Sequence, residues 1–218
     1  MKKVEIIYSD DNMIFVCKPV GTVSEYTQDD TPSVPKMLSE QTKAEIYPVH
    51  RLDKNVGGVM IFAKNKRSAA YLSDLIQKGK MHKSYVATVH GEPKDKDNLK
   101  DLLYKDRKTN KTYVVKRERK GVKAAELNYN VIARTELDGQ PVSVVRVDLV
   151  TGRSHQIRVQ FASRGYPLVG DRRYGAKDSC KQIELWSYSI AIDSDDSRYN
   201  KTVALSPPDS TLMSDFVE

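Results

Sequence analysis

The sequence has few of the residues that usually hold metal ions, cofactors or disulfide bonds. It contains two cysteines, Cys17 and Cys180, which form no Cys-x-x-Cys pair and have no metal-ligand spacing with the four histidines. The common glycine-rich phosphate loops are missing as well. We therefore predict a protein that works without a metal, nucleotide or redox cofactor, in a reducing intracellular compartment.

The sequence also lacks an apolar run long enough to span a bilayer. Its first residues are basic, but the acidic side chains within residues 5–11 exclude the apolar core of a signal peptide. We find no internal repeat and no flexible linker in the 218 residues, of which 39% are hydrophobic. These features predict a soluble cytoplasmic monomer with one domain, or two closely packed halves.

The charge is unevenly placed along the chain. The sequence has 36 Lys and Arg against 29 Asp and Glu, a formal net charge of +7, which favours polyanions such as RNA as partners. Between residues 105 and 123 only Asp106 and Glu118 oppose a run of cations: Lys105, Arg107, Lys108, Lys111, Lys116, Arg117, Arg119, Lys120 and Lys123. We predict phosphate contacts there; the alternative is an ordinary solvated surface.

Short apolar segments dominate the pattern and predict strands. They cover residues 4–8, 13–18, 59–63, 85–90, 113–115, 127–133, 142–149, 185–192 and 202–205. Helices are predicted over residues 35–43, from an N-cap at Ser68 to Gly79, and from an N-cap at Ser154 to Gly165. Strands and helices do not alternate regularly, so we predict an α+β fold with a mixed, mostly antiparallel β-sheet and flanking helices.

Asp53 is the first candidate for chemistry. It follows the extended residues His50, Arg51 and Leu52, and the turn after it leads into an apolar segment predicted to be a buried strand. A carboxylate in such a place can act as a nucleophile or a base. An aspartate that merely stabilises a turn is the alternative.

Arg158 and Tyr85 are the natural companions of this carboxylate. A guanidinium beside an aspartate favours its ionised form, so we predict that Arg158 pairs with Asp53. Polar side chains crowd the segment before it, namely Arg153, Ser154, His155 and Gln156, which suggests that the segment lines a site. Tyr85, at the start of an apolar strand, is a platform for a nucleobase or, alternatively, a core aromatic.

Taken together, these segments resemble the RluA-type RNA pseudouridine synthases. The resemblance begins at Ile7-Tyr8-Ser9-Asp10-Asp11 and runs through Lys18-Pro19-Val20-Gly21. It continues with His50-Arg51-Leu52-Asp53, residues 58–64 and Lys83-Ser84-Tyr85-Val86-Ala87. It ends with Thr151-Gly152-Arg153-Ser154-His155-Gln156-Ile157-Arg158 and with residues 165–171. Order and spacing agree over nearly the whole chain, and the combination is far more specific than any single motif.

The resemblance implies a fold, a reaction and site residues. The fold would be the pseudouridine synthase fold, with a central catalytic cleft. The reaction would convert specific uridines of tRNA or rRNA to pseudouridine without a cofactor, with Asp53, Tyr85 and Arg158 as catalytic residues. Asp53 would start cleavage of the glycosidic bond, either by attack on the ribose or by promoting elimination.

Substrate contacts are expected from a second set of residues. Arg51 would fill the space that the flipped base leaves in the RNA. The other members of this set are His50, Arg153, His155 and Gln156. Residues 1–218 would form a single catalytic domain without the separate N-terminal RNA-binding domain of many relatives.

Two segments depart from the pattern of the family. Val56-Gly57-Gly58 replaces the usual Thr-Ser-Gly, which removes two hydroxyls and adds a flexible residue. Leu185-Trp186-Ser187 stands where Leu-His-Ala is common. Both changes leave Asp53, Tyr85 and Arg158 in place and bear on substrate choice or efficiency.

Two other functions compete with the isomerase. The first is a non-catalytic RNA-binding protein on the same fold, which would have no need of a carboxylate beside RNA. The second is a glycosidase-like hydrolase, which needs two carboxylates across the bond. Asp171 is the candidate for the second carboxylate, although its place after Gly170 is typical of a structural turn.

Overall fold

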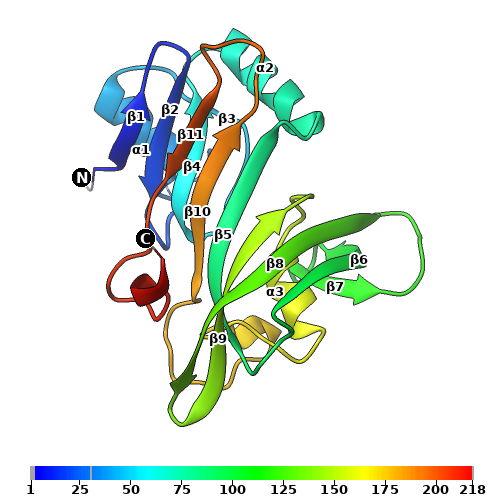
Figure 1. The fold of residues 1–218 in the computed structure, drawn as a ribbon. Helices are drawn as coiled ribbons and strands as arrows, with labels where there is room; N and C mark the ends of the chain where they lie inside the picture. The colour runs from blue at the N-terminus through cyan, green and yellow to red at the C-terminus, as the bar shows by residue number, and fades with distance from the viewer. Residues whose placement is uncertain (1–2, 30, 218) are drawn as a thin grey trace. The chain divides into compact units, whose positions relative to one another are not determined.

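The computed structural model describes residues 3–29 and 31–217 (Figure 1). The chain forms two compact units. The first comprises Met1–Lys83 and Trp186–Leu205, and the second comprises Ser84–Leu185 and Ser206–Glu218. The chain therefore crosses between the units three times: inside β5 (Met81–His90), inside β10 (Leu185–Ile192), and after Leu205.

The first unit is built on strands in the order β1-β2-β4-β10, with β3 on β4 and β11 on β10. Its pairs are antiparallel except β4–β10, which is parallel. Its other elements are β1 (Glu5–Ser9), β2 (Met13–Lys18), α1 (Val34–Thr42), β3 (Tyr47–Pro48), β4 (Gly57–Ala63), α2 (Lys66–Gln77) and β11 (Lys201–Ala204).

Every residue of β4 is buried, and its alternate side chains Val59, Ile61 and Ala63 share one apolar core with Leu72 and Leu75 of α2. Helix α2 is amphipathic because its apolar residues recur at spacings of three and four. The helix ends before Gly79, which has a φ of +71°.

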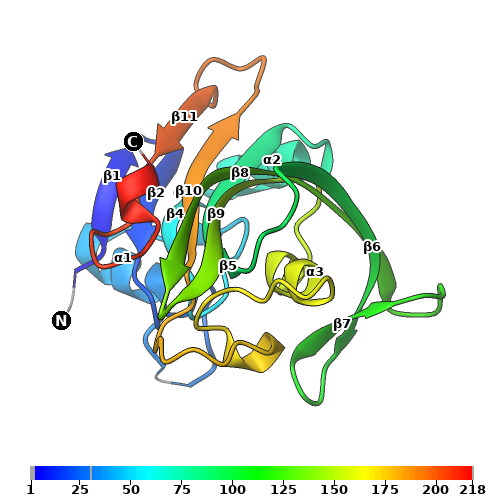
Figure 2. The same ribbon diagram turned by 60° about the horizontal axis from the view of Figure 1, so that its bottom comes forward.

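The second unit has the strand order β5-β9-β8-β6-β7, and these strands curve around helix α3 (Figure 2). Its remaining elements are β6 (Lys96–Asp106), β7 (Lys111–Val115), β8 (Val122–Leu137), β9 (Gln140–Leu149), α3 (Gln156–Ala162) and the 3-10 helices η1 (Arg172–Tyr174) and η2 (Ser214–Phe216). A small core joins Leu103 of β6 and Ala125 of β8 to Val159 of α3 and Tyr174 of η1.

The predicted α+β class and most of the predicted strands are confirmed. The basic residues 105–123 do surround a hairpin, β6–β7, but β6 itself went unpredicted because its sequence is so rich in charge. Both predicted N-caps are wrong. Asn65 caps α2 by accepting a hydrogen bond from the Ser68 N–H at 2.8 Å, and α3 starts only after His155, whose φ of 53° is left-handed.

None of the helices in the described part of the chain is long and apolar enough to cross a membrane.

Candidate active site

Asp53 lies in the first unit, on the turn that leads into β4. Its side chain is half-buried, between the buried Leu52 and the exposed Lys54. The Asp53 carbonyl accepts a hydrogen bond from the Val56 N–H at 3.0 Å, which closes the turn. A carboxylate is thus presented at the point where an irregular segment meets a buried strand.

The main chain on both sides of Asp53 is fixed by neighbouring loops. Before it, the Ser24 hydroxyl donates to the Leu52 carbonyl at 2.7 Å and accepts from the Leu52 N–H at 3.1 Å. After it, the Gly21 N–H donates to the Lys54 carbonyl at 2.8 Å. These bonds all end on backbone atoms of the turn.

Lys18 also binds the backbone of this turn. Its side chain is fully buried, and its ammonium donates to the carbonyls of Pro19 at 3.0 Å, Lys54 at 3.2 Å and Val56 at 2.7 Å. Burial lowers the pKa of Lys18 to about 8, while the nearby charge of Asp53 acts to raise it. Lys18 had no predicted role of its own, although a lysine that ends an otherwise apolar strand was a usable signal.

The predicted substrate residues His50 and Arg51 occupy different environments. The Nε2 atom of His50 accepts a hydrogen bond from the Ile61 N–H at 3.1 Å. Burial, assisted by the charge of Lys83, lowers the pKa of His50 to about 3, so the ring is neutral. Arg51 is exposed and forms a 3.2 Å ion pair with Glu25. His50 therefore fixes the segment before Asp53, whereas Arg51 points to solvent from it.

The two departures from the family pattern meet in the structure. Trp186 of β10 pairs with Gly57 of β4, and Ser187 pairs with Gly58. A Cβ atom at position 57 would lie 2.5 Å from Cζ3 of Trp186, so the indole occupies the space of a side chain there. The indole is itself fixed, because its Nε1 donates to the Leu205 carbonyl at 2.8 Å. Gly57 and Trp186 are thus one coupled change.

Gly58 is required for another reason. Its φ is +112°, and a Cβ atom there would collide with the backbone of Ser187.

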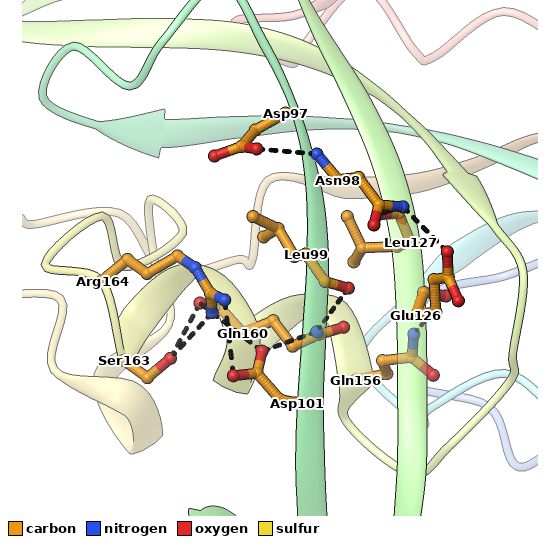
Figure 3. Close-up of polar contacts among 10 residues, drawn as sticks. All are labelled: Asp97, Asn98, Leu99, Asp101, Glu126, Leu127, Gln156, Gln160, Ser163 and Arg164. Atoms are coloured by element: carbon orange, nitrogen blue, oxygen red, sulfur yellow. Dashed lines mark hydrogen bonds and ion pairs between the residues drawn. The ribbon is translucent and has the colours of Figure 1, made fainter.

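In the second unit, two glutamines attach α3 to the strands (Figure 3). The Nε2 atom of Gln156 donates to the Glu126 carbonyl of β8 at 3.0 Å. One turn later, Nε2 of Gln160 donates to the Leu99 carbonyl of β6 at 3.2 Å and to Oδ2 of Asp101 at 2.7 Å. Helix α3 has only seven residues and no side-chain cap, so these bonds do much to fix its position.

Gln156 also fixes the segment before the helix. Its Oε1 accepts from the Thr151 hydroxyl and from the Arg153 N–H, both at 2.9 Å. The Arg153 side chain is exposed, and its Nε donates to the Ala124 carbonyl at 2.9 Å. The predicted substrate residues Gln156 and Arg153 are thus placed together, and the amide of Gln156 is largely used within the protein.

Arg158 forms a buried pair with Asp171. Its Nε lies 2.6 Å from Oδ2 and its Nη2 lies 2.8 Å from Oδ1 of the carboxylate, and both side chains are almost inaccessible. Such a two-pronged pair fixes the guanidinium plane. Asp171 is therefore a partner of Arg158. The predicted pairing of Arg158 with Asp53, which lies in the other unit, stays a prediction.

Tyr174 connects the neighbours of this pair. Its ring faces the Arg158 guanidinium at 5.0 Å, and its hydroxyl lies 2.8 Å from Nδ1 of His155 and accepts from the Thr112 N–H at 2.9 Å. His155 is thus oriented by Tyr174 at the start of α3. Tyr85, at the beginning of the second unit, is buried with 6% of its surface exposed.

Within residues 3–29 and 31–217, no three His, Cys, Asp or Glu side chains are grouped in a way that could hold a metal ion.

The chain is similar to RNA pseudouridine synthases over most of its length. The family model described as RNA pseudouridylate synthase matches residues 12–163. The dual-specificity RNA pseudouridine synthase RluA of Vibrio vulnificus is 36% identical over 195 residues, which cover 86% of this chain and 77% of that protein. The tRNA pseudouridine synthase C of Haemophilus ducreyi is 29% identical over 187 residues, covering 79% of this chain and 74% of that protein.

Among solved structures, human RNA pseudouridylate synthase domain containing 1 superposes with a TM-score of 0.78 at 22% identity, covering 97% of this chain and 86% of that one. This likeness supports the pseudouridine synthase fold. The chain therefore belongs to the RluA-type RNA pseudouridine synthases, the isomerases that convert uridine in RNA to pseudouridine.

Proposed function

We propose that this chain isomerises specific uridines of tRNA, rRNA or both, and that the carboxylate of Asp53 starts the reaction. The observation that carries the assignment is how the Asp53 turn is held. Its backbone is hydrogen-bonded to Lys18, Gly21 and Ser24, while Asp53 itself is half-buried. A reacting group needs this combination of a fixed origin and an accessible end.

The reaction exchanges one bond to the ribose for another. The bond from C1′ to N1 of uracil breaks, the ring turns, and a bond from C1′ to C5 forms. N1 gains a proton and C5 releases one to solvent. Asp53 acts either by attack on the ribose or by promoting elimination, and no electrons are exchanged with a cofactor in either route.

We propose roles for the other predicted residues. Tyr85 stacks on the flipped uracil, and Arg158 pairs with Asp53 while Asp171 holds its guanidinium plane. Arg51, being exposed, reaches into the RNA where the base has left the stack. His155, Arg153 and Gln156 shape the substrate contact before α3, and His50 supports the turn.

The proposal that tRNA is a substrate is supported by the similarity to the relative named tRNA pseudouridine synthase C. The alternative substrate is rRNA. We place the enzyme in the cytoplasm as a monomer without a metal, in keeping with a chain whose two cysteines are free.

Release of tritium from C5-labelled uridine tests the function. Bulk tRNA and rRNA transcribed with that label are incubated with the wild type and with Asp53→Ala, and the affinity of both proteins for each RNA is measured. Release by the wild type alone, with similar affinities, is the expected result. Intact binding with no release by the wild type on either RNA would overturn the catalytic assignment in favour of a binding protein.

A further inference from the structure

The second unit also contains a basic groove that has no part in the proposed reaction. The groove has a volume of about 510 Å³ and lies between β7 and the segment formed by α3 and η1. Its lining includes Lys111, Tyr113, Arg172, Arg173 and Tyr174. Three of these five side chains are cations.

The cations of this region differ from other cations of the same unit. Elsewhere, Arg134 pairs with Asp95 at 2.7 Å and Arg164 pairs with Asp101 at 2.8 Å. In the described part of the chain, by contrast, no carboxylate lies within ion-pair distance of Lys111, Arg172, Arg173 or the other cations of residues 105–123. This surface therefore carries charge that the fold itself does not neutralise.

The Asp106 carboxylate, which belongs to the same hairpin, is already used by the hairpin itself. Asp106 accepts from the Lys108 N–H at 2.9 Å and from the Thr109 hydroxyl at 2.8 Å, which stabilises the turn between β6 and β7. Arg173 then ties this turn to η1, because its Nη1 donates to the carbonyls of Thr109 at 2.9 Å and Asn110 at 3.3 Å. The walls of the groove are thus fixed to each other.

An aromatic surface accompanies the charge. Tyr113 keeps 41% of its surface exposed. The Lys111 ammonium lies 5.6 Å from the ring centre of Tyr113 and 5.4 Å from that of Tyr174. An exposed ring beside unneutralised cations suits a nucleic acid strand, whose bases stack while its phosphates bind the cations.

We propose that this groove binds the sugar-phosphate backbone of the RNA substrate, with Lys111 and Arg172 on phosphates and Tyr113 stacked on a base. The proposal rests on the proposed function for the identity of the ligand as RNA. It assigns to β7 and η1 of the second unit a role in holding RNA that is separate from the chemistry at Asp53. An acidic peptide is the competing ligand, and the planar ring of Tyr113 argues against it.

The test compares two double variants that remove the same charge. Lys111→Gln/Arg172→Gln changes the groove, whereas Lys66→Gln/Arg67→Gln removes two exposed cations from α2 in the first unit. Dissociation constants for tRNA are measured between 50 and 200 mM salt, roughly the range over which phosphate contacts change affinity most visibly. The groove variant should lower the slope of log K against log salt by about 1.5, because each phosphate contact contributes about 0.7–0.9.

Further readouts separate binding from chemistry and folding. The groove variant should raise KM for RNA about tenfold at moderate salt and leave kcat unchanged, and Tyr113→Leu should weaken binding about tenfold without altering the salt slope. Thermal unfolding of each variant controls for folding. Equal slopes and affinities for the groove and α2 variants would overturn the proposal, as would equally tight binding of polyglutamate by the wild type.

The groove and the synthase reaction can fail independently. If the wild type releases no tritium, and only the groove variant loses salt-dependent RNA affinity, the proposed reaction is rejected and the proposed groove is retained. Normal tritium release with identical RNA binding by both double variants would do the reverse.

Discussion

The two units fix their candidate site residues in different ways. In the first unit, the bonds that hold the Asp53 turn end on backbone atoms, chiefly the carbonyls of Leu52, Lys54 and Val56. In the second unit, the side chains of Gln156, Gln160 and Arg158 hold α3 and its surroundings. The identity of each residue therefore matters more around α3 than within the turn.

This difference explains which part of the family pattern changed. Val56 and Gly57 replace residues with hydroxyls, yet the turn keeps its bonds because Lys18 and Gly21 act on its main chain. The segment from Thr151 to Arg158 carries part of the resemblance to the family, and almost every polar side chain in it makes a bond within the protein. Fixing through the backbone tolerates substitution, whereas fixing through side chains does not.

Among the residues that support the site, the largest effect is expected when the backbone fixing is removed. Lys18→Met removes the ammonium that donates to the Val56 carbonyl and leaves the Lys54 carbonyl with the Gly21 N–H alone, so the turn should shift. We predict that kcat falls about a hundredfold, the usual cost of misplacing a reacting group by about an ångström. Tritium release at saturating RNA measures this change.

Surface variant Lys66→Met is the control for the loss of a lysine. An Lys18→Met protein that folds and keeps the wild-type kcat would show that the turn does not depend on this cation.

The coupled positions Gly57 and Trp186 give the next largest effect. Gly57→Ser forces a Cβ against the indole, and overpacking of this kind costs about 1–3 kcal/mol of unfolding free energy. Adding Trp186→His should recover most of that loss, since the smaller ring vacates the space. Chemical denaturation of the two single variants and the double variant gives the coupling, and additive losses would refute the idea of one coupled change.

The two glutamines of α3 should differ from each other. Gln156→Leu removes three hydrogen bonds within the protein and should cost about 2–3 kcal/mol of unfolding free energy. Gln160→Leu also removes an Oε1 atom that has no hydrogen-bond partner within residues 3–29 and 31–217, so its cost should be nearer about 1 kcal/mol. Denaturant titration measures both, and the reverse order would contradict our view of how α3 is attached.

The last prediction concerns the dependence of stability on pH. The pKa of His50 is lowered from 6.5 to about 3, so the unfolded chain binds the extra proton between these values. The free energy of unfolding should therefore fall as pH decreases from 6.5 toward 3, by up to about 1.4 kcal/mol per pH unit from this residue. His50→Gln should show a shallower decline, and identical pH profiles would exclude the buried neutral ring as the cause.

Local patterns in the sequence predicted those strands and helices that depend mainly on the burial and turn preferences of neighbouring residues. The strands at residues 13–18 and 59–63 were predicted correctly because burial of their apolar side chains fixes them. Strand β6 was not predicted, because its charged residues have a poor strand propensity. Its backbone hydrogen bonds with β7 and β8 outweigh that propensity in the structure.

The candidate site was predicted less completely than the fold. The motifs led to Asp53, Arg158 and Tyr85, but Lys18 and Asp171 were not recognised as their supports. Both act on partners that are distant in sequence, such as the Val56 carbonyl, 38 residues from Lys18. The spacing of neighbouring residues along the sequence does not predict such a contact.

The most direct test of the whole account is the rate of tritium release by Asp53→Asn under single-turnover conditions, with RNA saturated by protein. The carboxamide keeps the shape of the side chain and removes its charge and nucleophilicity. We predict that RNA affinity stays at the wild-type level while release slows about a thousandfold or more. Release at the wild-type rate would contradict the assignment of Asp53 as the group that starts the reaction.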